Sequence, residues 1–219
     1  MSRTCRRTLL DKALFENISL MKGKVLDIGG TKNNKRGNFR PVLDKVISWQ
    51  YVNSNPDTQP DFCCDAAGIP AKDGSFDTII MTELLEYVTD VQAVLNEAYR
   101  LLSPNGTCLV SVPFLNPVHG DSFIDRQRFT ALKLKELSST AGFGIVSIEP
   151  MGTLFSVIYD FLYVSFSYAR TRPNALTAKL ARQIIKPFKP LCLWLDSFSH
   201  DTKKYINTGY FVVLKKPNG

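Results

Sequence analysis

Residue types that build metal centres and disulfide frameworks are scarce in this sequence. Its 219 residues include five cysteines, two of them adjacent, and no Cys-x-x-Cys pair, which excludes a zinc ribbon and a disulfide-stapled secreted domain. We therefore expect no metal site. The basic residues near the N-terminus are followed by Leu-Leu-Asp-Lys rather than by an apolar segment, so the sequence predicts no secretory signal and a cytoplasmic protein.

Acidic residues are scarce in the last third of the chain. Residues 1–150 carry equal numbers of acidic and basic side chains, whereas residues 151–219 hold ten Lys and Arg against only Asp160, Asp196 and Asp201. The whole net charge of +7 therefore lies in the final third. This distribution predicts a neutral globular body with a basic appendage that has a task of its own.

Short apolar runs alternate with helical patterns along the body of the chain. This alternation predicts a doubly wound, Rossmann-like α/β fold, whose mostly parallel sheet is covered by helices on both faces. We expect seven strands, with a helical insertion before the last one. The predicted strands are 24–28, 46–53, 61–64, 76–81, 107–112, 143–149 and 210–215, and the predicted helices of the body are 6–21, 83–102 and 130–141. The expected division is a cofactor-binding core over 1–150, an insertion over 151–205 and a final core strand in 206–219.

Small and polar residues follow the first strands, at the edge where doubly wound sheets bind ligands. Glycine after the first strand lets a ligand approach the backbone closely, a polar side chain after the second can hold ribose hydroxyls, and an acid after the third can accept from an adenine amino group. An ordinary strand-to-loop turn explains the first of these equally well when it is considered alone. No G-x-G-x-x-G follows any strand, which argues against a dinucleotide-dependent oxidoreductase. The candidate cofactor-binding residues are Asp27, Gly29, Gly30, Asn55, Asp65, Ala66 and Thr82.

Five short motifs in a fixed order resemble the class I S-adenosylmethionine-dependent methyltransferases. The resemblance covers residues 20–150 and implies a methyltransferase that uses S-adenosylmethionine. A further stretch, from Ser111-Val112-Pro113-Phe114 to Arg128-Phe129-Thr130, resembles a branch linked to surface-polysaccharide and lipid-linked glycan biosynthesis. The five motifs are Val25-Leu26-Asp27-Ile28-Gly29, Asp65-Ala66 with Ile69-Pro70, Asp73-Gly74-Ser75-Phe76-Asp77, Glu83-Leu84-Leu85-Glu86-Tyr87-Val88 and Leu102-Ser103-Pro104-Asn105-Gly106.

Two positions depart from the family's pattern. Thr31 stands where the family's glycine loop has its third small residue, and Asn55 stands where an acid usually holds the ribose. An amide can still donate to and accept from hydroxyls, but it lacks the charge-assisted strength of a carboxylate. We therefore expect a modest affinity for the cofactor.

Few residues of the sequence could act as the general base for an oxygen acceptor, because it has only two histidines. His119 follows the strand that ends at Val112, in a loop that opens onto the active-site mouth in this fold, and Asp121 could orient or replace it. An ordinary surface-loop histidine is the alternative. Arg126 and Arg128 either hold a phosphate or carboxylate of the acceptor or brace the loop.

The insertion combines basic and apolar residues. In the predicted helix 151–168 the polar residues Ser156, Asp160, Tyr163 and Ser167 form a narrow stripe on an otherwise apolar surface. A membrane span is disfavoured because eighteen residues rise only about 27 Å and Asp160 lies near the centre. A helical cap packed on the core and a surface that lies on an anionic membrane both remain open. Apolar side chains outnumber charges, so no nucleic-acid partner is expected.

Three functions are compatible with these features. The first is a methyltransferase that acts on a membrane-proximal glycan or polar-headed lipid, attached peripherally to the inner face of the cell membrane. The second is a soluble small-molecule methyltransferase whose insertion is a substrate lid. The third is a cofactor-binding fold that has lost catalysis and serves as a partner protein.

Overall fold

The computed structural model describes residues 4–32, 37–39, 44–118, 124–168 and 175–218, and within them a single sheet of six strands forms the centre of the molecule. The strand order is β2-β1-β3-β4-β6-β5. All neighbours pair in parallel except β6, which runs antiparallel to both β4 and β5. The strands are β1 (Gly23–Ile28), β2 (Val46–Val52), β3 (Phe76–Thr82), β4 (Leu102–Pro113), β5 (Gly144–Met151) and β6 (Gly209–Lys215). The predicted doubly wound, mostly parallel sheet is confirmed.

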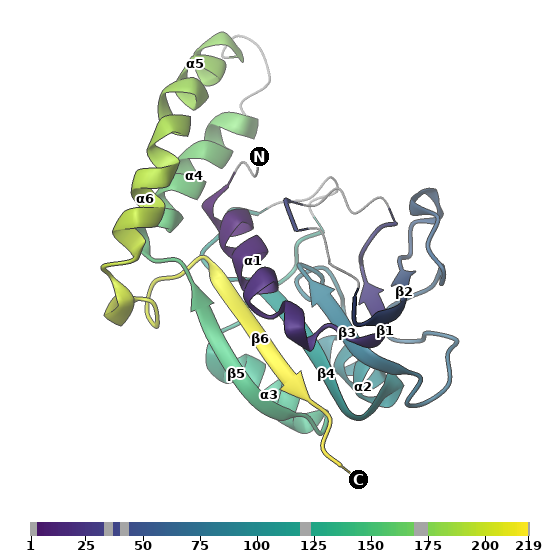
Figure 1. Cartoon of the computed structure of the whole chain (residues 1–219). Coiled ribbons are helices and arrows are strands. Elements are labelled where there is room, and N and C mark those ends of the chain that lie inside the picture. The colour runs from purple at the N-terminus through teal and green to yellow at the C-terminus, as the bar shows by residue number, and fades with distance from the viewer. Residues whose placement is uncertain (1–3, 33–36, 40–43, 119–123, 169–174, 219) are drawn as a thin grey trace.

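Helices cover both faces of this sheet (Figure 1). Helix α1 packs Leu10 and Leu14 on one face, against Val25 of β1 and Ile80 of β3. Helices α2 and α3 lie on the opposite face, where they bury the larger apolar cluster. The helices are α1 (Cys5–Glu16), α2 (Val91–Leu101), α3 (Ala131–Thr140), α4 (Leu154–Tyr168), α5 (Ala175–Ile185) and α6 (Lys189–Asp196), and the short 3-10 helices are Ile18–Leu20, Pro56–Thr58, Lys186–Phe188 and His200–Thr202.

Two predicted elements differ most from the structure. The strand predicted at 61–64 is reduced to one bridge between Phe62 and Val52, so the described part of the chain has six strands rather than seven. The helix predicted over 83–102 begins only at Val91, because the carboxylate of Asp90 accepts the N–H of Ala93 and caps its first turn. Residues 83–90, which were predicted as helix, form the loop between β3 and α2.

The insertion is fixed to the core by carboxylates at helix N-termini. Asp160 of α4 accepts the N–H groups of Cys5 and Arg6, at 2.6 and 2.8 Å, and so satisfies the start of α1. Asp196 of α6 does the same for α4, since it accepts the Ser156 N–H at 3.3 Å and the Ser156 hydroxyl. Burial, which outweighs these hydrogen bonds, raises the pKa of Asp160 from its ordinary value of 3.8 to about 6.

Helices α4 to α6 bury several polar side chains and leave many apolar side chains exposed. Asp160 and Ser156 of α4 are fully buried, whereas Phe161 and Leu162 of the same helix are 43% and 46% exposed. In Figure 1 these three helices extend beyond the end of the sheet, next to the N-terminus of α1. Among the described helices, none is long and apolar enough to cross a membrane. We call the following side chains the outer apolar residues: Leu154, Ile158, Phe161, Leu162, Leu176, Leu180, Ile184, Phe188, Leu191, Trp194 and Phe198.

Candidate functional site

A cleft of about 470 Å³ opens at the carboxyl ends of β1, β2 and β3. Ligands bind at this edge of doubly wound sheets, and the volume falls within the range of about 300–1,000 Å³ typical of small-molecule sites. The described residues that line it include three carboxylates and no Lys or Arg. They are Ile28, Gly29, Val52, Asn53, Ser54, Cys64, Asp65, Ala66, Ala67, Glu83, Leu84, Tyr87, Val88, Thr89, Asp90, Val94 and Ile124.

The glycine loop after β1 needs its two glycines for different reasons. Gly29 has φ +84°, in the left-handed region that favours glycine, and its N–H donates to the Val52 carbonyl at 2.8 Å. At Gly30 a Cβ atom would lie within 2.3 Å of the Asp27 carboxyl carbon. A side chain at Gly30 would therefore displace Asp27.

The predicted cofactor residues divide between two hollows. Gly29, Asp65 and Ala66 line the cleft. Asp27, Gly30 and Thr82 instead line a small hollow of about 30 Å³ that also touches Leu14 of α1. Since Gly29 and Gly30 are consecutive, the loop itself separates the two spaces.

Asn55 lies outside both hollows, and Asn53 takes its expected place. The Asn55 side chain accepts the N–H of Asp57 and caps a 3-10 turn. Asn53 lines the cleft, and its amide donates to the Gly30 carbonyl at 3.1 Å. The signal was present in the sequence, because Asn53 is the first residue after Val52, at the carboxyl end of β2.

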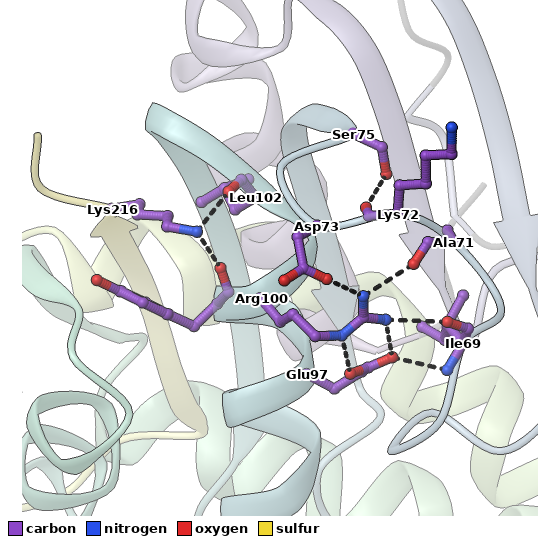
Figure 2. Close-up of polar contacts among 10 residues, drawn as sticks. Ile69, Ala71, Lys72, Asp73, Ser75, Glu97, Arg100, Leu102 and Lys216 are labelled. Atoms are coloured by element: carbon purple, nitrogen blue, oxygen red, sulfur yellow. Dashed lines mark hydrogen bonds and ion pairs between the residues drawn. The ribbon is translucent and has the colours of Figure 1, made fainter. Parts of the chain in front are cut away.

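Residues 69–73, which follow the cleft residues Asp65 and Ala66 in the chain, are anchored to α2 by Arg100 (Figure 2). The Arg100 guanidinium donates to the carbonyls of Ile69 and Ala71, at 3.0 and 2.8 Å, and pairs with Glu97 and Asp73. These two carboxylates raise the pKa of Arg100. Asp73, in the motif that leads into β3, thus supports the cleft from outside rather than lining it.

Glu83 brings the N-terminal helix to the cleft. It follows β3 with φ +53°, a strained conformation for a residue other than glycine. Its carboxylate forms an ion pair with Arg6 of α1 and accepts the Ser111 hydroxyl at 2.9 Å. Because Asp160 holds the backbone of Arg6, one line of contacts runs from α4 through α1 to the cleft.

Comparison with known proteins agrees with this geometry. A family model described as "Methyltransferase domain" matches residues 45–110, which include β2, β3 and most of the cleft lining. The whole fold superimposes on an S-adenosylmethionine-dependent methyltransferase from Archaeoglobus fulgidus with a TM-score of 0.56 at 17% identity, covering 96% of this chain and 94% of that one. The chain thus contains a methyltransferase domain and has the class I methyltransferase fold. The enzyme class and the S-adenosylmethionine cofactor expected from the sequence are confirmed.

Two relatives found by sequence extend the comparison. An uncharacterized protein of Methanocaldococcus jannaschii is 29% identical over 94% of this methyltransferase and 86% of its own length. A protein of Mycolicibacterium smegmatis, named "probable S-adenosylmethionine-dependent methyltransferase", is 31% identical over 36% of this chain and 33% of its own length. The shared part of the second relative is thus about a third of that protein.

Glu86 is a buried carboxyl beside the methyltransferase cleft. Its side chain is fully buried, and burial together with the nearby Glu83 carboxylate raises its pKa from 4.5 to about 8. It is therefore protonated at neutral pH. The carboxylates of Glu83 and Asp125 lie near Glu86, together with Arg6, so ionisation of Glu86 would add repulsion between carboxylates.

The predicted catalytic pair, His119 and Asp121, lies outside the described residues. The segment that follows is held firmly. Arg128 forms a bidentate ion pair with Asp125 and donates to the Asn116 carbonyl at 3.3 Å, so its described contacts brace the loop. Arg126 is exposed, and its Nε donates to the Tyr87 carbonyl at 3.3 Å.

Proposed function

We propose that this methyltransferase works at an anionic membrane surface, where it methylates a membrane-proximal glycan or a polar-headed lipid. The observation that carries the proposal is the exposure of the outer apolar residues on the insertion, whose helices α4 and α6 bury Asp160 and Asp196. Exposed apolar side chains gathered on one part of a protein mark a site of interaction with a membrane or a partner, and these all lie on the insertion. These helices follow the carboxyl end of β5, so they share the edge of the sheet that carries the cleft.

The charge of the cleft fits S-adenosylmethionine. Asp65 and Asp90 place carboxylates on the lining, and a third, on Glu83, is neutralised by Arg6. A cationic sulfonium is favoured in such surroundings, whereas the pyrophosphate of a dinucleotide would be repelled. When bound, the cofactor supplies an electrophilic methyl group, and the protein contributes chiefly by positioning.

The residues on the two sides of the glycine loop would contact different parts of the cofactor. Asp65 and Ala66 lie on the wall expected to meet adenine, and Asn53 offers an amide to the ribose hydroxyls. Asp27 and Thr82 lie beyond the loop, so they would meet only the amino-acid end.

His119, with Asp121, remains our candidate for removing a proton from an oxygen acceptor. A general base typically contributes about 10²–10⁴-fold, so His119→Gln should lower turnover by at least about a hundredfold and leave cofactor affinity unchanged. Turnover is measured with radiolabelled S-adenosylmethionine and membranes of the source organism. Near-normal turnover in the variant would show that His119 is an ordinary surface-loop histidine and not the general base.

Membrane attachment is tested by co-sedimentation with vesicles of phosphatidylglycerol and of phosphatidylcholine. Basic residues near an anionic surface contribute about 1 kcal/mol each, so the protein should pellet with the anionic vesicles and dissociate partly in high salt. Replacing the exposed Lys179, Lys186 and Lys204 with glutamine should weaken this binding. The same changes at the exposed Lys133 and Lys135 of α3 provide the control. A protein that ignores vesicles of both compositions would have a packed cap or lid instead.

A further inference from the structure

A second hollow, which we call the groove, lies between the loop after β4 and helix α4. Its volume is about 370 Å³. Apolar side chains form one part of its lining: Phe114, Leu115, Val118 and Phe161. The cofactor residues discussed above are absent from its described lining, so the groove is distinct from the cofactor cleft.

The groove and the cleft share a thin wall. Ile124 lines the cleft, whereas the next two residues, Asp125 and Arg126, line the groove. The Arg126 N–H donates to the Glu86 carbonyl at 2.8 Å, which fixes this wall to the loop after β3. A ligand in the groove would therefore lie beside a cofactor in the cleft.

The other end of the groove reaches the surface of the insertion. Phe161 lines the groove and also belongs to the outer apolar residues, with 43% of its surface exposed. Phe161 would therefore contact an apolar chain both in the groove and on the surface of the insertion.

The charges of the groove and the cleft predict the orientation of a bound ligand. The Asp125–Arg128 ion pair is neutral as a unit, so Arg126 leaves the described groove lining with one net positive charge, opposite to the acidic cleft. A phosphate is favoured beside Arg126 and disfavoured in the cleft.

We propose that the groove binds the phosphate and the adjoining hydrocarbon of a lipid phosphate acceptor, with the phosphate beside Arg126 and the chain along Phe161. The group to be methylated then points toward the cleft. This inference rests on the proposed function, since it names the substrate class of the same enzyme.

The test uses decyl phosphate as the probe, below its micelle concentration and without vesicles, in calorimetric titrations of the full-length protein. Phe161→Ala should raise the dissociation constant at least about fivefold, because one aromatic wall of the groove is lost. Leu162→Ala is the matched control: Leu162 is on the same helix, is 46% exposed and lies outside the described groove lining. It should leave the dissociation constant within twofold of the original. Equal effects of the two substitutions, or no binding of decyl phosphate, would overturn the proposal.

Two further experiments complete the test. The first distinguishes binding of the phosphate from binding of the hydrocarbon chain, and the second distinguishes the groove from membrane attachment. Decyl maltoside and inorganic phosphate should each bind more weakly than decyl phosphate, and Arg126→Gln should abolish the advantage of decyl phosphate over decyl maltoside. If the Arg126→Gln variant still binds decyl phosphate more tightly than decyl maltoside by the original factor, the proposed phosphate site beside Arg126 is refuted. Both Phe161→Ala and Leu162→Ala should weaken vesicle binding alike, so a protein that binds decyl phosphate but ignores vesicles would contradict membrane attachment and leave the groove standing.

Discussion

Replacing Glu86 with glutamine should remove a pH dependence from the free energy of unfolding. The fully buried carboxyl has its pKa raised from 4.5 to about 8, chiefly by burial and next by Glu83. Between these two pH values the folded protein keeps a proton that the unfolded chain releases. Stability therefore falls as pH rises through this window, and the contribution is complete only below the unfolded pKa.

The size of the effect follows from the two pKa values. A difference of one pKa unit corresponds to about 1.36 kcal/mol, so the shift from 4.5 to about 8 amounts to about 5 kcal/mol across the whole window. Glutamine has nearly the same shape as the protonated carboxyl and does not titrate. Asp160, whose pKa is raised to about 6, contributes its own loss of stability at lower pH, so the window from pH 6 to pH 8 isolates Glu86.

Urea unfolding followed by circular dichroism at pH 5, 6, 7 and 8 measures this dependence. The original protein should lose about 2–3 kcal/mol between pH 6 and pH 8, and the Glu86→Gln variant should lose little. The variant should therefore be the more stable protein at pH 8. If the variant keeps the slope of the original protein over this range, the assignment of a neutral, buried Glu86 is refuted.

Three further substitutions test the supports of the site. Arg100→Lys keeps the charge but cannot bridge two carbonyls and two carboxylates, so urea unfolding should show a loss of about 2 kcal/mol and calorimetry a weaker binding of S-adenosylmethionine; an unchanged unfolding midpoint would contradict the role in Figure 2. Asp160→Ala leaves the N–H groups of Cys5 and Arg6 without their acceptor, which should lower stability by about 1–2 kcal/mol in thermal unfolding; a Tm equal to that of the original protein would argue against this cap. Asn53→Ala should weaken cofactor binding, whereas Asn55→Ala should not, and the reverse order would restore Asn55 as the ribose ligand.

The sequence predicts most of the core because its strands are continuous apolar runs. The strands at 24–28 and 76–81 were found to within one residue, since buried parallel strands show uninterrupted hydrophobicity. Thr130 caps the helix predicted at 130–141, and a hydroxyl before a helical pattern is a local signal that the sequence carries. The start of α2 was missed, although Asp90 carries a similar signal.

The details that sequence reasoning missed depend on contacts between distant residues. The strand predicted at 61–64 has the right composition, yet of these four residues only Phe62 forms a β-bridge with β2. The pairing of Asp160 with the start of α1 joins residues more than 150 positions apart, so no local pattern encodes it. The polar stripe that contains Asp160 was found, but only the fold shows that it faces the protein. The ion pair of Glu83 with Arg6 is likewise a contact between distant residues that no local pattern encodes.

Calorimetric titration with S-adenosylmethionine tests the central claim, that the cleft at the carboxyl ends of β1 to β3 holds the cofactor. We predict measurable binding to the original protein and a dissociation constant at least about fivefold higher for Asp65→Ala, which removes a charged group from the cleft wall. Asp57→Ala, at an exposed aspartate outside the described cleft lining, should bind like the original protein. No heat at millimolar cofactor, or equal affinities for the two variants, would contradict the account.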